Sequence, residues 1–410
     1  MTKKSDAPAI RFKGFSDAWE QRKLTEFVEF FSGLTYTPND VQENGTLVLR
    51  SSNVSNGEVV DADNVYVNPQ VVNSENVKVG DIVVVVRNGS RSLIGKHAQI
   101  KAFMPNTVIG AFMTGIRSEC PEFTNALLNT SRFEEEVAMN MGATINQITG
   151  YMFSKMEFKV PCLDEQKKIG EYFEKLDRLV TLHQRKFEKL TNVKKSMLEK
   201  MFPQNGSSYP EIRFKGFTDP WEQRKLSEMC GTFEYGLNAS AKEFDGKNKY
   251  IRITDIDDAS REFLLSDLSS PDICLDGMSK YLLSSGDIVF ARTGASVGKT
   301  YIYRENDGIV YFAGFLIRAK VNQDNDAEFV FQSTLSPSYE KYIRITSQRS
   351  GQPGVNAQEY GEYDLFAPSK EEQQRIGHFL RGIDNLITLH QRELEKLQNI
   401  KKSMLEKMFV

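Results

Sequence analysis

The sequence predicts an α+β protein in which two mixed α/β domains are separated by two long, antiparallel coiled-coil helices, with internal pseudo-two-fold symmetry. Three observations predict this architecture. A 17-residue segment and a 38-residue segment each occur twice, and the two long segments between the copies differ in sequence. Repetition of this kind indicates that one structural unit is built twice along the chain.

The shorter repeat is a duplicated anchor. The segment "IRFKGFSDAWEQRKLTE" at residues 10–26 returns as "IRFKGFTDPWEQRKLSE" at 212–228, with 14 of 17 positions identical. We expect residues 1–26 to form the first anchor and residues 203–228 to hold a linker and the second anchor. The linker, "PQNGSSYPE", is rich in residues that break helices and strands.

The longer repeat predicts the two helices. A 38-residue segment returns 207 positions later with 24 identical residues, and both copies repeat apolar residues at steps of four and three. This pattern, which lasts about four to five heptads, is typical of a coiled coil. Lys194 and Lys401 interrupt the two apolar rows. We expect helices over residues 164–202 and 371–410, each about 57 Å long; two helices on separate cores are the alternative.

Histidine and cysteine, the side chains that most often bind zinc, are few. His183 and His390 occupy matched positions in the two apolar rows, but no Cys, carboxylate or third His completes a ligand set around them. We therefore expect packed, hydrogen-bonded histidines and no metal site. The cysteines are far apart and form no CxxC pair, so we expect them to be reduced and mostly buried: Cys120, Cys162, Cys230 and Cys274.

The two long segments, residues 27–163 and 229–370, are predicted to be mixed α/β domains. Their strand candidates are rich in Val, Ile and aromatic residues. The expected strands are 81–87, 250–254, 288–292 and 313–318, and the expected helices are 125–140 and 327–342.

A polar, cationic loop follows the "GDIV" strand in each segment. The loops are "VRNGSRSLIGK" at 86–96 and "ARTGASVGK" at 291–299. The second loop is similar to a phosphate-binding loop, which needs four residues between Gly and Gly-Lys. The two loops have five and three residues there, so neither has the required spacing. A nucleotide-binding enzyme is therefore only an alternative hypothesis.

These loops have residue types that suit DNA. Arg fits guanine edges, Lys and Ser hold phosphate, and Asn and Gln suit adenine edges. A second loop pair, at 141–150 and 348–358, adds further polar residues. For any single residue, a solvated turn is the alternative. The candidate DNA-binding residues are Arg87, Asn88, Ser90, Arg91, Lys96, Asn146, Gln147, Arg292, Thr293, Ser296, Lys299, Arg349, Gln352 and Asn356.

The charge distribution argues against a DNA-binding protein that acts alone. Residues 27–163 carry 10 Lys/Arg against 14 Asp/Glu, and residues 229–369 carry 14 against 20. The expected helices are weakly basic, at +3 and +1, and the chain is −3. Because phosphate contacts dominate DNA affinity, either charge is segregated on each domain or a partner supplies part of the attraction.

The sequence contains no signal for a membrane. No apolar run approaches the roughly 18 residues that span a bilayer. The N-terminus, "MTKKSDAPAI", lacks the apolar stretch of a signal peptide. We therefore expect a cytoplasmic protein without a membrane partner.

Taken in order, these motifs resemble the specificity (S) subunit of type I restriction-modification enzymes. The resemblance rests on the duplicated anchor, "SGLTYTPNDV" at 32–41, the "GDIV…R-x-G…GK" strands and the "P-x-x-x-E-Q…I" helix entries. No single motif is specific, but their order, which occurs twice, is. The resemblance covers nearly the whole chain.

The resemblance implies that the mixed domains are target-recognition domains, each reading one half of an asymmetric bipartite DNA sequence. It implies a non-catalytic chain without a cofactor of its own. Two methylation subunits would bring S-adenosylmethionine and the adenine-N6 methyltransferase site, and two restriction subunits would bring ATP, Mg and the nuclease. A coiled-coil scaffold that does not read DNA is the alternative, and it leaves the divergence of the two domains unexplained.

Overall fold

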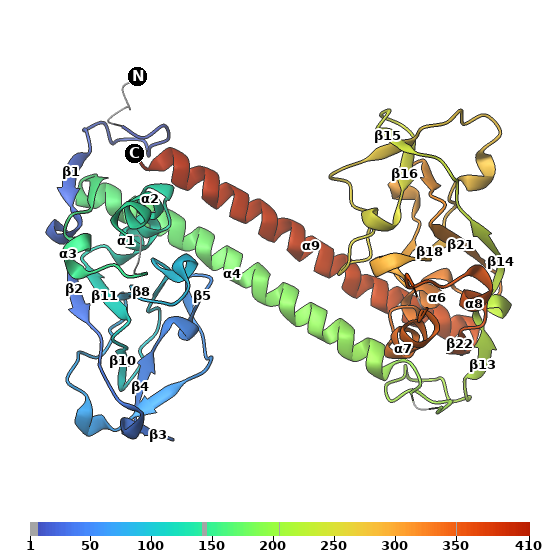
Figure 1. Ribbon diagram of the computed structural model, residues 1–410, viewed down its shortest axis with the longest axis horizontal. Helices are drawn as coiled ribbons and strands as arrows, with labels where there is room; N and C mark the ends of the chain where they lie inside the picture. Colours follow the sequence, from blue (N-terminus) through green and yellow to red (C-terminus); the bar gives the residue numbers. More distant parts are fainter. Residues whose placement is uncertain (1–6, 142–145, 205, 350) are drawn as a thin grey trace. The chain divides into compact units, whose positions relative to one another are not determined.

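The protein folds as two compact units. Unit 1 comprises Met1–Leu182 with Glu393–Val410, and unit 2 comprises His183–Arg392. Each unit contains the start of one long helix and the end of the other (Figure 1). The computed structural model describes residues 7–141, 146–204, 206–349 and 351–410. Residues 1–6 of the expected first anchor, and Asn205 of the expected linker, lie outside the described residues.

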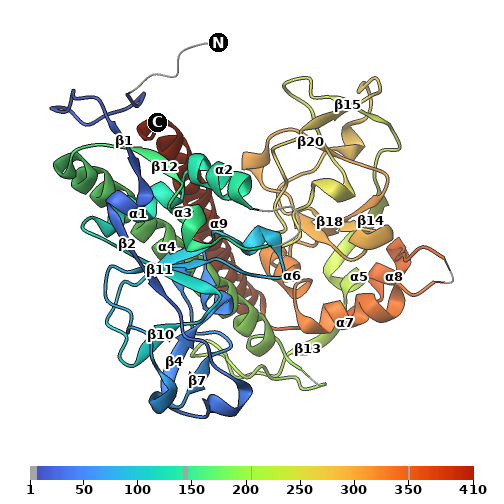
Figure 2. The same ribbon diagram turned by 60° about the vertical axis from the view of Figure 1, so that its left-hand side comes forward.

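The described part of unit 1 contains two four-stranded sheets and two strand pairs. The first sheet is antiparallel, in the order β2-β11-β8-β9: Val28–Ser32, Met113–Ser118, Ile82–Val85 and His97–Gln99. The second has the order β10-β4-β7-β3: Thr107–Ile109, Thr46–Leu49, Val65–Val67 and Val41–Gln42. The pairs are β1-β12 and β5-β6: Glu20–Lys23, Glu157–Val160, Val54–Ser55 and Glu58–Val59. The second sheet lies at the end of the unit opposite β1 (Figure 1 and Figure 2).

Unit 2 repeats the first of these sheets and the strand pair next to the anchor. Its four-stranded sheet has the order β14-β21-β18-β19: Cys230–Tyr235, Leu316–Val321, Ile288–Ala291 and Thr300–Ile302. β13 and β22 pair as β1 and β12 do: Glu222–Lys225 and Asp364–Ala367. Two further pairs are β16-β20 and β15-β17: Lys249–Ile251, Val310–Phe312, Ala241–Glu243 and Ser269–Pro271.

The remaining elements are helices, which include the two long helices α4 and α9. The helices that begin in unit 1 are α1 to α4: Pro121–Leu128, Ser131–Asn140, Gly150–Phe153 and Leu163–Lys200. Those that begin in unit 2 are α5 to α9: Leu226–Met229, Ala327–Ser333, Pro337–Thr346, Ala357–Gly361 and Lys370–Met408. Every residue of the central strands β8 and β18 is buried, so the sheets pack on both faces.

The prediction of one continuous helix in each middle segment was wrong. The expected helix at 125–140 is two helices, because Thr130 accepts a hydrogen bond from the Phe133 backbone N–H at 3.3 Å and starts α2. The expected helix at 327–342 also divides, where Ser336 caps α7 just before a proline. Ser and Thr are favoured at helix N-caps and proline is favoured in the first turn, so both signals were present in the sequence.

The expected strands were only partly right. The strand expected at 250–254 ends at Ile251, because the carboxylate of Asp255 accepts the Arg252 backbone N–H at 2.9 Å and closes a 3-10 turn. The strand expected at 313–318 begins only at Leu316. Short caps of this kind compete locally with the hydrogen bonds of a sheet.

An arginine of each anchor pairs with a glutamate at the start of a long helix. The Arg11 guanidinium donates two hydrogen bonds to the Glu165 carboxylate, at 2.7 and 2.8 Å, and Glu165 is fully buried. Arg213 and Glu372 make the same contact at 2.8 Å for both bonds. Two parallel N–H···O bonds fix the orientation of both side chains, so the anchor arginine is held in the same way in both units.

A phenylalanine at the end of each long helix completes the core of a unit. In unit 1, Phe409 lies among three rings at centroid distances of 6.1, 5.5 and 5.9 Å: Trp19, Phe123 and Phe173. In unit 2, Phe202 packs against two rings at 6.2 and 5.5 Å: Trp221 and Phe329. Each core therefore needs the end of one helix and the start of the other.

Within each unit the helices α4 and α9 pack together in antiparallel orientation. In unit 2, His183 contacts His390 while the later residue Lys194 contacts the earlier residue Asp384, at 2.5 Å. In unit 1, the lysine that interrupts the other apolar row makes the matching ion pair with Asp177 at 2.6 Å. The two interruptions of the heptad pattern are therefore interhelical ion pairs. Leu198 and Leu405, which lie outside the expected rows, are also buried.

Residues with metal-ligating chemistry are packed or isolated. His183 and His390 lie with their Nδ1 atoms 3.1 Å apart, so the expected packed and hydrogen-bonded histidines are observed. The expectation of mostly buried cysteines was half right, since Cys162 and Cys274 are exposed at a helix start and in a loop. Among the described residues there is no cluster of three or more potential metal ligands. No described helix is long and apolar enough to cross a membrane.

Candidate nucleic-acid interface

The "GDIV" strands end in hairpin turns rather than phosphate-binding loops. The backbone N–H of Gly95 donates to Val85 at 2.9 Å, and that of Gly298 donates to Ala291 at 3.0 Å. Both glycines have positive φ, 86° and 85°, which glycine adopts without strain. Each turn leads directly into an antiparallel neighbouring strand. A phosphate-binding loop leads from a strand into a helix, so the topology contradicts the nucleotide-binding alternative.

The structure brings the two predicted loops of each segment together. Arg87 forms an isolated β-bridge with Gln147, and Thr293 forms one with Gly354. Matching hydrogen bonds of 2.8 and 2.9 Å join Ile148 to Val86 and Val355 to Arg292. Residues that lie about 60 positions apart in the sequence are therefore neighbours at the end of the central strand in both units.

Parts of the second loops lie outside the described residues. Residues 142–145 belong to the expected loop at 141–150, and Ser350 belongs to the expected loop at 348–358. The predicted residues in these loops, including Asn146 and Arg349, are all described.

In unit 1, several predicted residues hold the loop itself together. Asn88 donates to Ser51 Oγ at 3.0 Å and accepts the Ser90 backbone N–H at 2.9 Å. The Asn146 amide donates to the Gly89 carbonyl at 3.0 Å. The other predicted residues of this loop include its three cationic side chains. Arg87 and Arg91 are exposed, and Lys96 is half-buried.

In unit 2, three predicted residues are committed to internal contacts. Lys299 forms an ion pair with Asp258, and its side chain is only 15% exposed. Arg349 pairs with Glu359. Asn356 caps α8 by accepting the backbone N–H of that same glutamate at 2.9 Å. The residues left at the surface of the turn are half-buried or exposed: Arg292, Thr293, Ser296 and Gln352.

Sequence reasoning missed three exposed aromatic residues beside these turns. Phe112, Phe315 and Tyr235 are 56%, 57% and 45% exposed. The Arg87 guanidinium lies over the Phe112 ring, 5.1 Å from its centroid. Arg292 lies near the other two rings, 5.1 Å from Tyr235 and 5.8 Å from Phe315. The short motifs "GAFM" and "AGFL", in otherwise different segments, were a signal that could have identified the two phenylalanines.

The two arginines reach equivalent rings from different backbone positions. The Phe112 carbonyl accepts the backbone N–H of Val86 at 3.0 Å, and the Phe315 carbonyl accepts that of Arg292 at 3.0 Å. Arg292 therefore matches Val86, and Arg87 lies one residue further along. The stack of a guanidinium on the phenylalanine is retained although the register of the arginine changes.

A buried tyrosine holds the turn of unit 2 in place. The Tyr360 hydroxyl donates to the Ala291 carbonyl at 2.6 Å and accepts the Gly298 backbone N–H at 3.1 Å. Burial raises the pKa of Tyr360, so its hydroxyl stays protonated and can donate at neutral pH. Phe153, also buried, takes the matching place in unit 1 and has no such hydroxyl.

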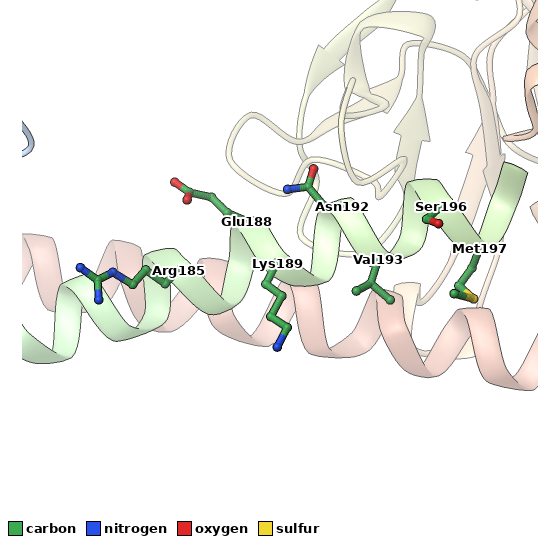
Figure 3. Close-up of a pocket in the computed structure, with 7 residues that line it drawn as sticks. All are labelled: Arg185, Glu188, Lys189, Asn192, Val193, Ser196 and Met197. Carbon is green, nitrogen blue, oxygen red and sulfur yellow. The ribbon is translucent and has the colours of Figure 1, made fainter. Parts of the chain in front are cut away.

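The surface also contains a groove of about 520 Å³ along α4 in unit 2. Figure 3 shows that its lining side chains all come from this one helix. None of these lining residues belongs to the loops with the predicted DNA-binding residues.

The fold and these turns together define a protein with two recognition units, each built on the start of one long helix and the end of another. The sequence profile of the type I restriction modification DNA specificity domain matches residues 16–192 and 218–399. The chain belongs to this family. It is a specificity subunit of a type I restriction-modification system, whose catalytic activities lie in other subunits.

Several known proteins are similar to this chain. The StySPI specificity subunit of Salmonella potsdam and the EcoKI specificity subunit of Escherichia coli are each 22% identical over 96% of this chain and 89% of theirs. The MjaVIII specificity subunit of Methanocaldococcus jannaschii is 24% identical, and the match spans 64% of each chain. A type I S subunit from M. genitalium has the same fold, with a TM-score of 0.69, 15% identity and coverage of 98% and 99%.

Proposed function

We propose that this chain selects an asymmetric, bipartite DNA sequence for its restriction-modification complex. Residues 27–163 set one half-site and residues 229–370 set the other. The observation that supports this proposal most is the pair of turns that follow the central strands, at residues 86–96 and 291–299, which we call the recognition turns. A hairpin turn, a β-bridge to a second loop and an arginine beside an exposed phenylalanine recur in both units, although the two segments have different sequences.

The proposed DNA contacts are the surface groups of these turns. In unit 1 they are Arg87 and Arg91 with the polar residues beside them, and in unit 2 they are Arg292 and its neighbours. The internal ion pairs of Lys299 and Arg349 make these two cations weaker candidates than the sequence suggested. Arg is the common partner of guanine, and Ser and Thr can hold phosphate.

The proposal includes partners that compensate for the acidic recognition segments. We infer a complex with two methylation and two restriction subunits, which bind S-adenosylmethionine, ATP and Mg and perform the chemistry. Both recognition segments have a net negative charge. Cationic surfaces on partners would therefore supply part of the attraction to phosphate. Because chromosomal DNA is the substrate of such a complex, we place it in the cytoplasm.

Methylation mapping tests this function. Long-read sequencing of cells that carry the chain with its methylation subunits should show one split motif, which is absent without the chain. Exchange of residues 229–370 for the segment of a relative should change one half of that motif only. A single continuous motif, or a change in both halves, would contradict the proposal.

A point substitution tests the turn of unit 2. Arg292→Ala should weaken methylation of the bipartite site, because a bidentate contact to a base contributes about 1–3 kcal/mol. Assembly with the methylation subunits should be unchanged, since the side chain is at the surface. Arg224→Ala, in the anchor strand β13, is the matched control and should methylate normally. Normal methylation by Arg292→Ala would remove this residue from the proposed interface.

A further inference from the structure

Each unit presents one arginine on an exposed aromatic surface at the turn after its central strand. We propose that these stacks are preassembled guanine-reading elements, in which Arg87 and Arg292 contact the base. Phe112, Phe315 and Tyr235 are the positioning residues that hold the two guanidinium groups. This inference rests on the proposed function and assigns a chemical target, one guanine, to each half-site.

The recurrence of the stack is the first support. The two recognition segments share little sequence, and the arginines occupy backbone positions that differ by one residue. Their guanidinium groups still lie over equivalent phenylalanine rings, at 5.1 and 5.8 Å. A contact that is retained while the backbone position of one partner changes points to the position of the charged group as the feature that is needed.

The second support is the charge environment of the two arginines. Three other arginines also lie over aromatic rings. Arg117 and Arg318 are committed to carboxylates, whereas Arg375 lies over Phe217 and stands on the long helix α9 rather than on a turn. Arg117 pairs with Asp81 at 2.9 Å, and Arg318 pairs with Glu234. In the part of the chain that the structure describes, Arg87 and Arg292 have no ion pair. Their N–H groups are therefore available to an external acceptor.

Stacking suits an arginine that reads a base. A ring against the flat face of the guanidinium leaves the in-plane N–H groups free, and two of them match O6 and N7 of guanine in the major groove. The ring also restricts the long side chain before binding, which lowers the entropy cost of ordering it on DNA. A cation–π contact at an exposed site contributes about 0.5–1 kcal/mol, which is enough to favour one orientation.

The two stacks differ in strength. Tyr235 stands on β14 opposite Ile317, and the matching position on β2 is Ser32, opposite Thr114. Among the described residues, Arg292 therefore contacts two rings and Arg87 one. The Tyr235 hydroxyl also accepts the Ala357 backbone N–H at 3.3 Å, which holds its ring in place. We expect the guanine read by Arg292 to be discriminated more strongly than the guanine read by Arg87.

Binding measurements on the assembled complex test the inference. The chain and its methylation subunits are titrated with duplexes of the methylated sequence, in which each guanine is replaced in turn by 7-deazaguanine, which lacks N7. For the wild type, one such replacement in each half-site should weaken binding about 5- to 150-fold. Phe112→Leu should weaken discrimination at its guanine about 2- to 5-fold, and Phe112→Tyr should restore it.

The controls separate positioning from folding. Phe103→Leu removes another exposed ring from unit 1, 79% exposed, and should leave discrimination unchanged. Phe112→Leu should affect only the first half-site, and Phe315→Leu only the second. On the duplex with 7-deazaguanine at the contacted position, the difference between Phe112→Leu and the wild type should become smaller, because one of the two proposed acceptors is absent.

Each other result has a defined meaning. A half-site without guanine, or a Phe112→Leu complex that discriminates like the wild type, overturns the guanine-reading stacks and leaves the proposed function intact. Equal weakening on specific and unrelated DNA also overturns them, because it indicates a general loss of affinity. A wild-type complex with no preference for any bipartite duplex would instead count against the proposed function.

Discussion

The anchors of the two units are nearly identical in sequence and contacts, whereas the hairpin turns differ in length. Arg11 with Glu165 and Arg213 with Glu372 form the same bidentate pair at nearly equal distances. The hairpin turns have different lengths, nine residues at 86–94 and six residues between Ala291 and Gly298. The contacts that attach a long helix tolerate little change, while the turns can vary on a constant sheet.

Side chains behind the turns differ as well. Tyr360 holds the unit 2 turn with two hydrogen bonds, and Phe153 takes its place in unit 1. His97 is buried in β9, where Thr300 lies in β19, bonded to Thr334 at 2.7 Å. Two similar folds therefore stabilise their turns by different chemistry. Substitutions at equivalent positions of the two units should therefore change the stability of both units equally at the anchors and unequally near the turns.

The largest effect is expected where a long helix ends. Phe202→Ala should destabilise unit 2 by about 3–5 kcal/mol, because it empties a buried aromatic site. Phe409→Ala should destabilise unit 1 by less, since Phe409 is only half-buried. Amide hydrogen exchange, followed in peptides from each unit, measures the two effects separately. Phe103→Ala, at an exposed site, is the control; an equal loss in both units for either variant would contradict separate cores.

The anchor ion pairs come next and should respond equally. Glu165→Gln and Glu372→Gln should each destabilise their unit by about 3 kcal/mol, because each leaves a guanidinium without its buried carboxylate. Chemical unfolding with the same exchange readout gives both values. A difference of more than about 1 kcal/mol would show that the repeated anchors are not energetically equivalent.

A smaller effect is expected from the tyrosine that only unit 2 has. Tyr360→Phe removes both hydrogen bonds to the turn and should cost about 1–2 kcal/mol. Protection of the amides at 292–298 should fall, and methylation of the second half-site should weaken. Tyr209→Phe, at an exposed linker residue, should change neither quantity. Unchanged protection in Tyr360→Phe would mean that the turn is held by its backbone alone.

The smallest effect concerns acid and unit 1. Burial lowers the pKa of His97, whose Nδ1 contacts the Gly95 carbonyl at 3.0 Å. The unfolded chain therefore binds a proton at His97 near pH 6.5, whereas the folded unit binds this proton less readily. The contribution of His97 to the stability of unit 1 is fully present above the pKa of the unfolded state and is lost as the pH falls below that value.

Acidification from pH 7.5 to 5.5 should accordingly cost unit 1 about 1 kcal/mol more in the wild type than in His97→Gln. Exchange rates in unit 1 peptides, corrected for intrinsic pH dependence, provide the measurement. The substitution should leave the pH response of unit 2 unaltered. Identical pH dependence in the two proteins would show that folding does not lower the pKa of His97.

Much of the fold could be predicted because its signals are local. The helix expected at 164–202 is observed at Leu163–Lys200, since heptad spacing is encoded by neighbours on one helix face. The breaks at Thr130 and Ser336 were not predicted, although both residues are of types favoured at helix N-caps. The burial of Leu198 could not be predicted from the helix alone, because the core that covers it comes from distant residues.

The site was predicted less well than the fold. Arg87 and Arg292 were predicted as DNA contacts from their residue type and place after a strand, and this stays a prediction; the structure leaves Arg87 exposed and Arg292 half-buried. Lys299 looked equivalent in the sequence, but a remote aspartate neutralises it. Phe112 and Phe315 were missed, because an exposed phenylalanine cannot be distinguished from a core residue by a short motif.

The sequence by itself determined that the chain is built twice, that long helices follow the recognition segments, and that those segments differ. These properties depend on identity and spacing along the chain. Only the tertiary structure decided which cations remain available and which rings lie beside them. Sheet register brings together residues as far apart as Arg292 and Gly354, and that register follows from packing across the whole unit rather than from any local pattern.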